Sequence, residues 1–254
     1  MDNSSNKLIS VQICTYNRAN LIKEAIQSVL DQTYENFEIV IIDDASTDNT
    51  EEVVKSFSDS RIKYFKNEKN LGIAKNRNIA VQRSSGKYIA ILDSDDLWND
   101  SKKLEKQIRF LEENLSVGVI GTQAYKIDLK GNILGKLKKE LTEKNIRKKI
   151  LSTNQFVNSS VLIRKKIIEE FGGYDESLSG IEDYDLFLKI GQKYQFQNLA
   201  SFSTSYRTGH ESYSSNRKKI AQYHLQLVQK NQKNYPNYIK ALLKSYLRLF
   251  RATF

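Results

Sequence analysis

Short apolar runs alternate with helical patterns along the first 125 residues, and this alternation restricts the fold more than any other feature of the chain. The apolar runs predict strands at 8–14, 37–42, 62–66, 88–92 and 117–121. The patterns between them predict helices at 19–30, 48–58, 72–83 and 101–114. Because repeated strand–helix–strand units build a mostly parallel sheet, we expect an α/β fold.

The pattern changes beyond residue 125. We expect a turn at 128–132, a short basic helix at 142–151 and a strand at 156–163. Further helices are predicted at 165–171, 181–191, 215–233 and 236–252. Nothing before residue 210 resembles a linker, so the expected division is one domain over residues 1–212 and a helical tail over 213–254.

Acidic and polar residues end three of the predicted strands. Cys14-Thr15-Tyr16-Asn17 ends the first, Asp43-Asp44 the second and Asp93-Ser94-Asp95-Asp96 the fourth. Ligands of open α/β sheets bind outside the carboxyl ends of the strands. Neighbouring carboxylates repel each other unless a cation or hydrogen-bond donors compensate, and Mg²⁺ or Mn²⁺ shared with phosphate oxygens suits them. This pattern indicates a nucleotide diphosphate, and the alternative is that each acidic cluster caps the following helix.

Four segments with these properties occur in order along the chain: CTYNRANLIKEAIQSVLDQTY, IVIIDDASTDNT, NLGIAKNRNIAVQRSSGKYIAILDSDD and GIEDYDLFLKI. Over roughly residues 7–210 the chain resembles the family 2 glycosyltransferases with the GT-A fold. The resemblance implies a single domain in which a Rossmann-like nucleotide-binding half and an acceptor-binding half share a mostly parallel mixed sheet, here with a C-terminal helical tail. It also implies an inverting, metal-dependent transferase that moves a sugar from a nucleotide diphosphate sugar, with a UDP-sugar favoured, to a hydroxyl of a glycan or lipid-linked acceptor in surface polysaccharide synthesis.

The resemblance assigns several residues to the nucleotide. Thr15 and Tyr16 would contact the base, the tyrosine by stacking, and Asp44 would accept a hydrogen bond from the base. Arg77 would reach the nucleotide with Asn78 as its support; the alternative for Arg77 is a solvated arginine on a helix surface.

The same resemblance assigns roles to the acidic strand end. Asp93 would lie nearer the ribose or sugar, and Asp95 would bind the Mn²⁺ or Mg²⁺ that bridges the diphosphate. Asp96 would support the turn. His210, in the segment YRTGHES, would be a second metal ligand, although its spacing from Arg207 is one residue longer than the usual pattern; the alternative is a surface loop histidine.

On the acceptor side, the resemblance makes Asp183 the general base and places Glu182 beside it, in contact with the donor sugar or the acceptor. A carboxylate that accepts the proton of a poorly nucleophilic sugar hydroxyl contributes on the order of 10²- to 10⁴-fold to the rate. The alternative role for these acids, and the expected role of Asp185, is a favourable interaction with a helix N-terminus.

The net charge of +10 is concentrated in the tail. From residue 216 to 254 there are nine Lys or Arg and no Asp or Glu, so residues 1–215 carry a balance of only +1. Apolar residues recur at helical spacing within 236–252, with basic residues between them, which indicates a basic amphipathic helix. Two interpretations stay open: attachment to an anionic membrane surface, or packing and homodimer formation through residues 236–254. No nucleic-acid module is recognisable, so nucleic acid is not an expected partner.

Two other functions compete with a transferase. A sugar-phosphate nucleotidyltransferase would also place carboxylates and a metal beside a nucleotide, but it usually needs a glycine-rich loop after the first strand, and CTYNRAN has no glycine. A non-catalytic scaffold that binds membranes or a partner would not need both Asp95 and Asp183. The single cysteine, the absence of a signal-peptide pattern and the lack of a long apolar run predict a cytoplasmic protein, with peripheral attachment to the inner face of the plasma membrane as an option.

Overall fold

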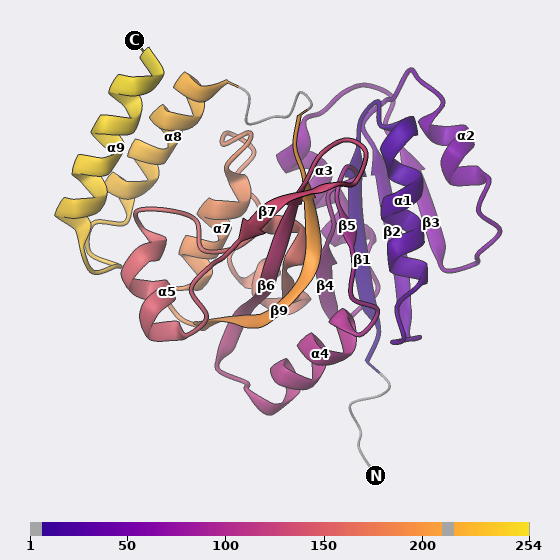
Figure 1. The fold of residues 1–254 in the computed structure, drawn as a ribbon, viewed down its shortest axis with the longest axis horizontal. Coiled ribbons are helices and arrows are strands. Elements are labelled where there is room, and N and C mark those ends of the chain that lie inside the picture. The colour runs from indigo at the N-terminus through magenta and orange to yellow at the C-terminus, as the bar shows by residue number, and fades with distance from the viewer. Residues whose placement is uncertain (1–6, 210–215, 254) are drawn as a thin grey trace.

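The computed structural model describes residues 7–209 and 216–253 (Figure 1). His210 lies outside these residues, so its predicted role as a metal ligand stays a prediction. None of the helices in the described part of the chain combines the length and the apolar composition that are needed to cross a bilayer.

One mixed sheet forms the centre of the molecule. Its strands are β1 (Ile9–Thr15), β2 (Phe37–Asp43), β3 (Ile62–Lys66), β4 (Tyr88–Ile91), β5 (Leu97–Trp98), β6 (Val117–Ile127), β7 (Ile133–Leu137), β8 (Leu162–Arg164) and β9 (Gln195–Arg207). The strand order is β3-β2-β1-β4-β8-β6-β9-β5, with β7 paired to β6. The first four strands of this order are parallel, whereas β8 is antiparallel to both of its neighbours and β6 is parallel to β9. The predicted mixed α/β architecture is therefore confirmed.

Helices cover both faces of this sheet (Figure 1). They are α1 (Ala19–Leu30), α2 (Thr50–Lys55), α3 (Ile73–Arg83), α4 (Lys103–Glu113), α5 (Glu143–Ile150), α6 (Lys165–Glu170), α7 (Glu182–Ile190), α8 (Arg217–Lys230) and α9 (Tyr238–Thr253). Buried side chains of α1 and α4 form one apolar core with the sheet, and those of α3, α5, α6 and α7 form a second. Strands β1, β2 and β4 are buried almost along their whole length because both faces of the sheet are covered, whereas the edge strand β3 has no buried residue.

The second half of the sheet departs from the sequence prediction. The predicted strand at 156–163 is wrong for its first part, because Asn158–Ser160 forms a 3₁₀ turn and the strand begins only at Leu162. Ser and Asn side chains compete with strand pairing by bonding nearby backbone, and Ser160 Oγ donates to Val157 O at 2.7 Å. Strands β5, β7 and β9 are absent from the sequence prediction. For β9 the reason is its sequence, QFQNLASFSTSYR, which contains no continuous apolar run.

The tail helices pack on the domain through α7. Leu227 and Val228 of α8 and Ala241 of α9 belong to the same buried core cluster as α7. Asp185, expected only as a helix-terminal acid, is buried and forms ion pairs with Lys189 at 2.6 Å and Lys230 at 3.2 Å, so it links α7 to α8. Whether the tail is a separate unit from residue 213 stays a prediction.

A buried histidine joins the two tail helices. His224 of α8 is 3% exposed, its Nδ1 lies 3.0 Å from Ser245 Oγ of α9, and its ring lies 5.7 Å from the ring of Tyr184. Burial, with help from Arg248 and Lys244, lowers the pKa of His224 to about 3. The neutral imidazole is therefore the form that the folded protein holds.

This histidine predicts a pH-dependent stability. A histidine in the unfolded chain titrates near pH 6.5, so between pH 6.5 and 3 the unfolded state binds more protons than the folded state. The stabilisation that the folded state gains from a neutral His224 is complete above pH 6.5 and declines as the pH falls through this window. At pH 4 the unfolding free energy should be lower by about 3 kcal/mol for this reason. His224→Gln keeps a polar side chain that does not titrate, so its unfolding free energy in urea should fall less between pH 7 and pH 4 than that of the wild type. Equal losses in both proteins would contradict the assignment.

Candidate active site

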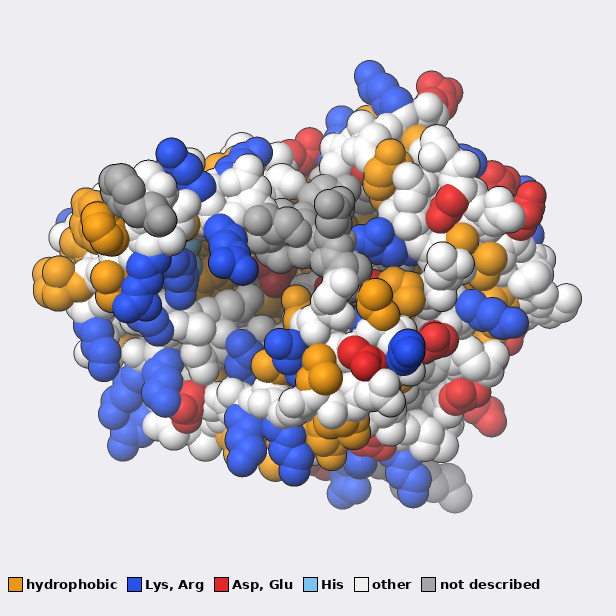
Figure 2. Space-filling view, turned by 45° about the horizontal axis from the view of Figure 1, so that its top comes forward, with side chains coloured by type: hydrophobic (Ala, Val, Ile, Leu, Met, Phe, Trp, Pro, Cys, Tyr) orange, Lys and Arg blue, Asp and Glu red, His pale blue; other side chains and the backbone are white. Residues whose placement is uncertain are grey.

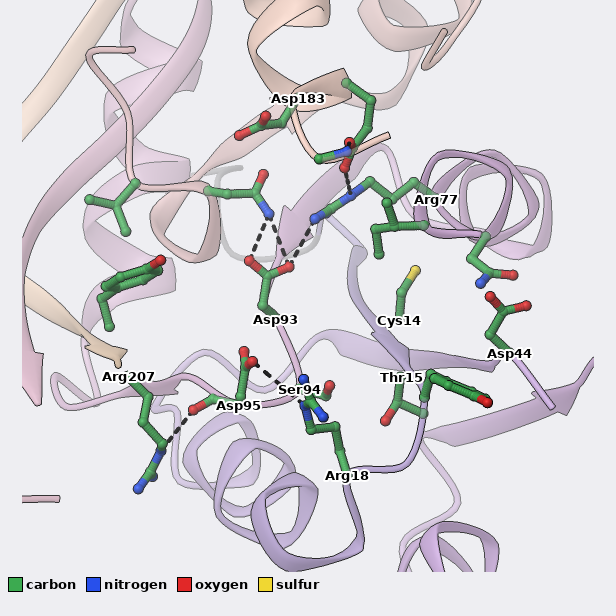
Figure 3. A pocket seen from close by; sticks show the side chains of 18 of the residues that line it. Cys14, Thr15, Arg18, Asp44, Arg77, Asp93, Ser94, Asp95, Asp183 and Arg207 are labelled. Carbon is green, nitrogen blue, oxygen red and sulfur yellow. Dashed lines mark hydrogen bonds and ion pairs between the residues drawn. The ribbon is translucent and has the colours of Figure 1, made fainter. Parts of the chain in front are cut away.

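A cavity of about 980 Å³ opens where the carboxyl ends of β1, β2 and β4 meet the start of α7. This is the size of a small-molecule site, and it lies where ligands of α/β sheets bind. Residues from distant parts of the chain point into it, as Figure 3 shows for Cys14 of β1, Asp93 after β4 and Asp183 of α7. The first half of the chain supplies one wall, the segment 137–183 supplies a second, and residues 206–209 complete the lining.

Asp93 is held by donors from both walls. Its carboxylate accepts from Arg77 Nη2 at 2.9 Å, and its Oδ2 lies 3.2 Å from Ser159 Oγ. Asn158 Nδ2 donates to both of its oxygens, at 3.1 and 3.0 Å (Figure 3). These bonds fix the orientation of the carboxylate, because each oxygen has a partner on a different element.

Arg77 is a buried arginine that bridges two acids. It is 7% exposed, and besides Asp93 it donates from Nε to Glu182 Oε1 at 3.0 Å. Burial alone would lower its pKa, but Asp93 and Glu182 raise the pKa of Arg77 well above its ordinary value. The alternative of a solvated helix arginine is therefore wrong, and Arg77 is a permanent cation inside the site.

Asp183 faces the cavity from the first turn of α7. Its Oδ1 accepts from the backbone N–H of Tyr184 at 2.7 Å, and its Oδ2 lies 3.4 Å from Asn154 Nδ2. Burial, followed by the neighbouring Glu182 carboxylate, raises the pKa of Asp183 to about 7, against the lowering effect of Arg77. A carboxyl with such a pKa can exchange a proton near neutral pH.

Glu182 differs from Asp183 although it is adjacent. It is 3% exposed, and while one oxygen bonds to Arg77, the other accepts from the backbone N–H of Gly180 at 2.7 Å. Both oxygens are thus used in holding the start of α7 against α3.

Asp95 and Asp96 point in different directions. Asp95 lines the cavity, where one of its oxygens lies 3.7 Å from Arg18 Nε, and its backbone carbonyl accepts from Arg207 Nε at 2.8 Å (Figure 3). Asp96 is buried and accepts from Ser159 Oγ and from the backbone N–H of Arg207 at 2.7 Å. Burial, and after it Asp95 and Asp93, raises the pKa of Asp96 well above its usual range. These contacts hold the turn after β4 against the end of β9.

The chemistry of these residues fits a divalent cation that is shared with a ligand. Within residues 7–209 and 216–253 no group of three or more His, Cys, Asp or Glu could hold an ion alone. Mg²⁺, however, usually takes only one or two carboxylates and completes its shell with phosphate and water. Asp93 and Asp95 both line the cavity within this turn, so a carboxylate oxygen and a ligand phosphate could share an ion there.

The three residues predicted for the nucleotide base, Thr15, Tyr16 and Asp44, all line the cavity. Thr15 lines the cavity and its buried Oγ1 has no partner within the described residues, and Tyr16 beside it is 38% exposed. Asp44 lines the cavity too, but its carboxylate also accepts from the backbone N–H groups of Leu71 at 2.7 Å and Gly72 at 2.9 Å. Asp44 therefore shapes the loop before α3 as well as the cavity wall.

Asn78, which was predicted at the nucleotide site, is not among the described residues that line the cavity. Its amide donates to Tyr174 O at 3.0 Å and accepts from the backbone N–H of Tyr174 at 2.8 Å. These bonds fix the loop before α7, and the predicted part of Asn78 as the support of Arg77 at the nucleotide stays a prediction.

Sequence reasoning missed two residues that line the second wall, Asn158 and Lys139, and two that contact Asp183 and Asp93 from behind it, Asn154 and Ser159. The segment containing Asn158 was predicted as a strand, which hid its contact with Asp93. Lys139 lines the cavity, its Nζ donates to Asn154 O at 2.8 Å, and burial lowers its pKa although Asp183 acts to raise it. The polar run STNQFVNSS at 152–160 was the available signal, since a polar stretch between apolar segments is typical of a binding loop.

Comparison with known proteins connects this geometry to a family. The family model described as Glycosyl transferase family 2 matches residues 10–172, more than half of the chain. An uncharacterized glycosyltransferase of Methanocaldococcus jannaschii is 36% identical over 240 residues, which cover 91% of this chain and 82% of the relative. A UDP-Glc:α-D-GlcNAc-diphosphoundecaprenol β-1,3-glucosyltransferase of Escherichia coli is 36% identical over 212 residues, which cover 83% and 81%.

Solved structures agree on the fold. Staphylococcus aureus TarS 1-349 in complex with UDP-GlcNAc superposes with a TM-score of 0.74 at 20% identity, covering 96% of this chain and 72% of that one. The mannosyltransferase PcManGT of Pyrobaculum calidifontis, in complex with GDP-Man and Mn²⁺, superposes with a TM-score of 0.72 at 21% identity, covering 98% and 73%. The chain therefore has the GT-A fold and belongs to glycosyltransferase family 2.

Proposed function

We propose that this transferase is inverting and metal-dependent, and that it moves a sugar from a UDP-sugar to a hydroxyl of a glycan or lipid-linked acceptor in surface polysaccharide synthesis. The observation that carries the proposal is the pair of opposed walls in one cavity: Asp93 and Asp95 on one side, and Asp183, a buried carboxyl with a pKa of about 7, on the other. The E. coli relative, whose name specifies UDP-Glc and a lipid diphosphate acceptor, supports the choice of substrates.

Each wall has a separate task in this proposal. Thr15, Tyr16 and Asp44 bind the nucleotide base, and Asp93 orients the donor near its ribose or sugar. Asp95, with His210 as a further candidate ligand, would hold Mn²⁺ or Mg²⁺. When bound, the ion supplies positive charge that stabilises the departing diphosphate.

Asp183 acts on the acceptor as the general base. The acceptor oxygen forms a bond to the anomeric carbon while the bond from that carbon to the diphosphate oxygen breaks, and the hydroxyl proton passes to Asp183. Attack from the side opposite the leaving group gives one displacement and inverts the anomeric configuration. Glu182 stays bonded to Arg77 and to the Gly180 N–H, so it holds Arg77 and the neighbouring Asp183 in fixed positions beside the sugar.

A lipid-linked acceptor would place this enzyme at a membrane. Peripheral attachment to the inner face of the plasma membrane is therefore part of the proposal, and homodimer formation through residues 236–254 is the alternative use of the tail.

The donor and the metal predict a conditional stabilisation. UDP at about 100 times its dissociation constant should stabilise the folded protein by about 2.7 kcal/mol, which raises the melting temperature by several degrees, in the presence of Mn²⁺ or Mg²⁺. The Asp95→Asn variant should lose most of the metal-dependent part of this stabilisation. The Asp31→Asn variant, which changes an exposed acid outside the cavity, should keep it. A thermal shift assay with UDP and GDP measures this. No shift with either nucleotide and either ion would count against the proposal.

The base predicts a loss of turnover without a loss of binding. Asp183→Asn cannot accept the proton, so transfer should fall at least about 100-fold while the UDP-induced thermal shift stays unchanged. Asp175→Asn, an acid in the loop before α7, is the matched control and should keep its activity. In the wild type, protonation of Asp183 below its pKa of about 7 should lower kcat/KM about tenfold per pH unit. Full activity of Asp183→Asn would remove it as the base.

Arg77 predicts coupled effects on stability and on pH dependence. Arg77→Met leaves Asp93 and Glu182 without their shared cation, so the unfolding free energy should fall by about 3–5 kcal/mol. The double variant Arg77→Met/Glu182→Gln removes one of the two uncompensated charges and should recover part of that loss. Because Arg77 lowers the pKa of Asp183, the acid limb of the pH–rate profile should move to higher pH in Arg77→Met. Denaturant titration and pH profiles test both, and an unmoved acid limb would contradict the coupling.

A further inference from the structure

The outer side of α9 carries a stripe of exposed apolar side chains. Ile239, Leu243, Tyr246 and Leu247 are 65, 66, 51 and 50% exposed, and we call these four residues the α9 stripe. Their spacing of three and four residues places them on one side of the helix, while the opposite side buries Ala241 against the core that α7 and α8 share. Contiguous exposed apolar surface of this kind marks an interaction site.

A row of basic side chains runs along one edge of this stripe. Lys240, Lys244, Arg248 and Arg251 follow one another at spacings of four, four and three residues. Within the described residues, Lys230 of the tail forms an ion pair with Asp185, whereas none of the four basic residues of this row forms an ion pair. Lys244 Nζ donates to Thr153 Oγ1 at 2.8 Å, and burial, followed by Arg248 and Lys240, lowers the pKa of Lys244. The row is thus a concentration of positive charge that the described part of the protein does not neutralise.

The stripe and the row lie together at one end of the molecule. Figure 2 shows orange and blue side chains side by side at its left end, over α8 and α9. On the same face and next to this end, a hollow contains red acidic side chains. A flat partner bound to this end would therefore lie beside the opening of the cavity.

We propose that the α9 stripe and its basic row bind the surface of an anionic phospholipid bilayer. The apolar side chains would enter the boundary between headgroups and acyl chains, and the lysines and arginines would contact lipid phosphates. A second copy of this chain would cover the stripe but would bring more positive charge to the row, since residues 216–254 contain no Asp or Glu. An anionic bilayer satisfies both features, because it offers apolar depth and negative charge in one surface.

Vesicle sedimentation of the full chain tests this proposal without using its sugar chemistry. The wild type should bind vesicles of phosphatidylcholine with phosphatidylglycerol at least about tenfold more tightly than vesicles of phosphatidylcholine alone, and added salt should weaken the binding. Leu243→Glu/Leu247→Glu should reduce binding more than about tenfold. The matched control is Leu115→Glu/Ile133→Glu, which changes two side chains that are 74 and 64% exposed elsewhere, and it should bind like the wild type.

The charges are tested in the same assay. Lys240→Gln/Arg251→Gln should weaken binding about fivefold per residue, whereas Lys23→Gln/Lys102→Gln, exposed basic residues of other elements, should not. Circular dichroism and melting temperatures should stay close to those of the wild type in all four variants, because every changed side chain is exposed. The proposal is overturned if the wild type binds neither vesicle, or if the α9 variants bind as it does. It is equally overturned if sedimentation velocity shows a lipid-free dimer that Leu243→Glu/Leu247→Glu dissociates, since the stripe would then be a dimer contact.

Discussion

Arg77 joins the two halves of the active site through two ion pairs, to Asp93 at 2.9 Å and to Glu182 at 3.0 Å. Asp93 lies just after the parallel strand β4, and Glu182 begins a helix of the second half, 89 residues further along the chain. A buried cation between two acids is stabilising only while all three are present, because any one left alone carries an uncompensated charge. The geometry of the cavity therefore depends on this bridge, which fixes the position of Asp93 on one side and, through Glu182, the position of the neighbouring Asp183 on the other.

Neighbouring carboxyl groups in this site differ in their hydrogen bonds and in their pKa values. Both oxygens of Glu182 accept hydrogen bonds, one from Arg77 and one from the Gly180 N–H. Among the described residues Asp183 has no direct bond to a cation, and its pKa is about 7. After β4, Asp96 is buried against Ser159 and the Arg207 backbone, while Asp95 stays at the cavity. Adjacent acids thus take different roles because burial and hydrogen-bond donors differ from one side chain to the next.

The tail is attached to the site through its own polar contacts. Asp185 of α7 is paired with Lys230 of α8, and His224 of α8 contacts both Ser245 of α9 and the ring of Tyr184. Since α7 also begins with Glu182 and Asp183, the helix that carries these two acids of the cavity is the helix on which the tail packs. The outer side of α9 is left exposed by this packing, which makes it available to a partner at the end of the molecule next to the cavity.

Local pattern was enough to predict much of this protein. Alternating apolar runs placed β1 to β4 and the helices between them within a residue or two for most elements, and acids at the strand ends marked the cavity wall, because periodicity and strand-end chemistry are written in consecutive residues. The tertiary structure alone decided the second wall. Asn158 and Ser159 reach Asp93 from a 3₁₀ turn that interrupts an expected strand. Arg77 is buried between Asp93 and Glu182, and Asn78 bonds to the loop before α7. Apart from the pair of Arg77 and Asp93, those contacts join residues 65 to 105 positions apart, and their formation depends on packing between elements, which no local pattern contains.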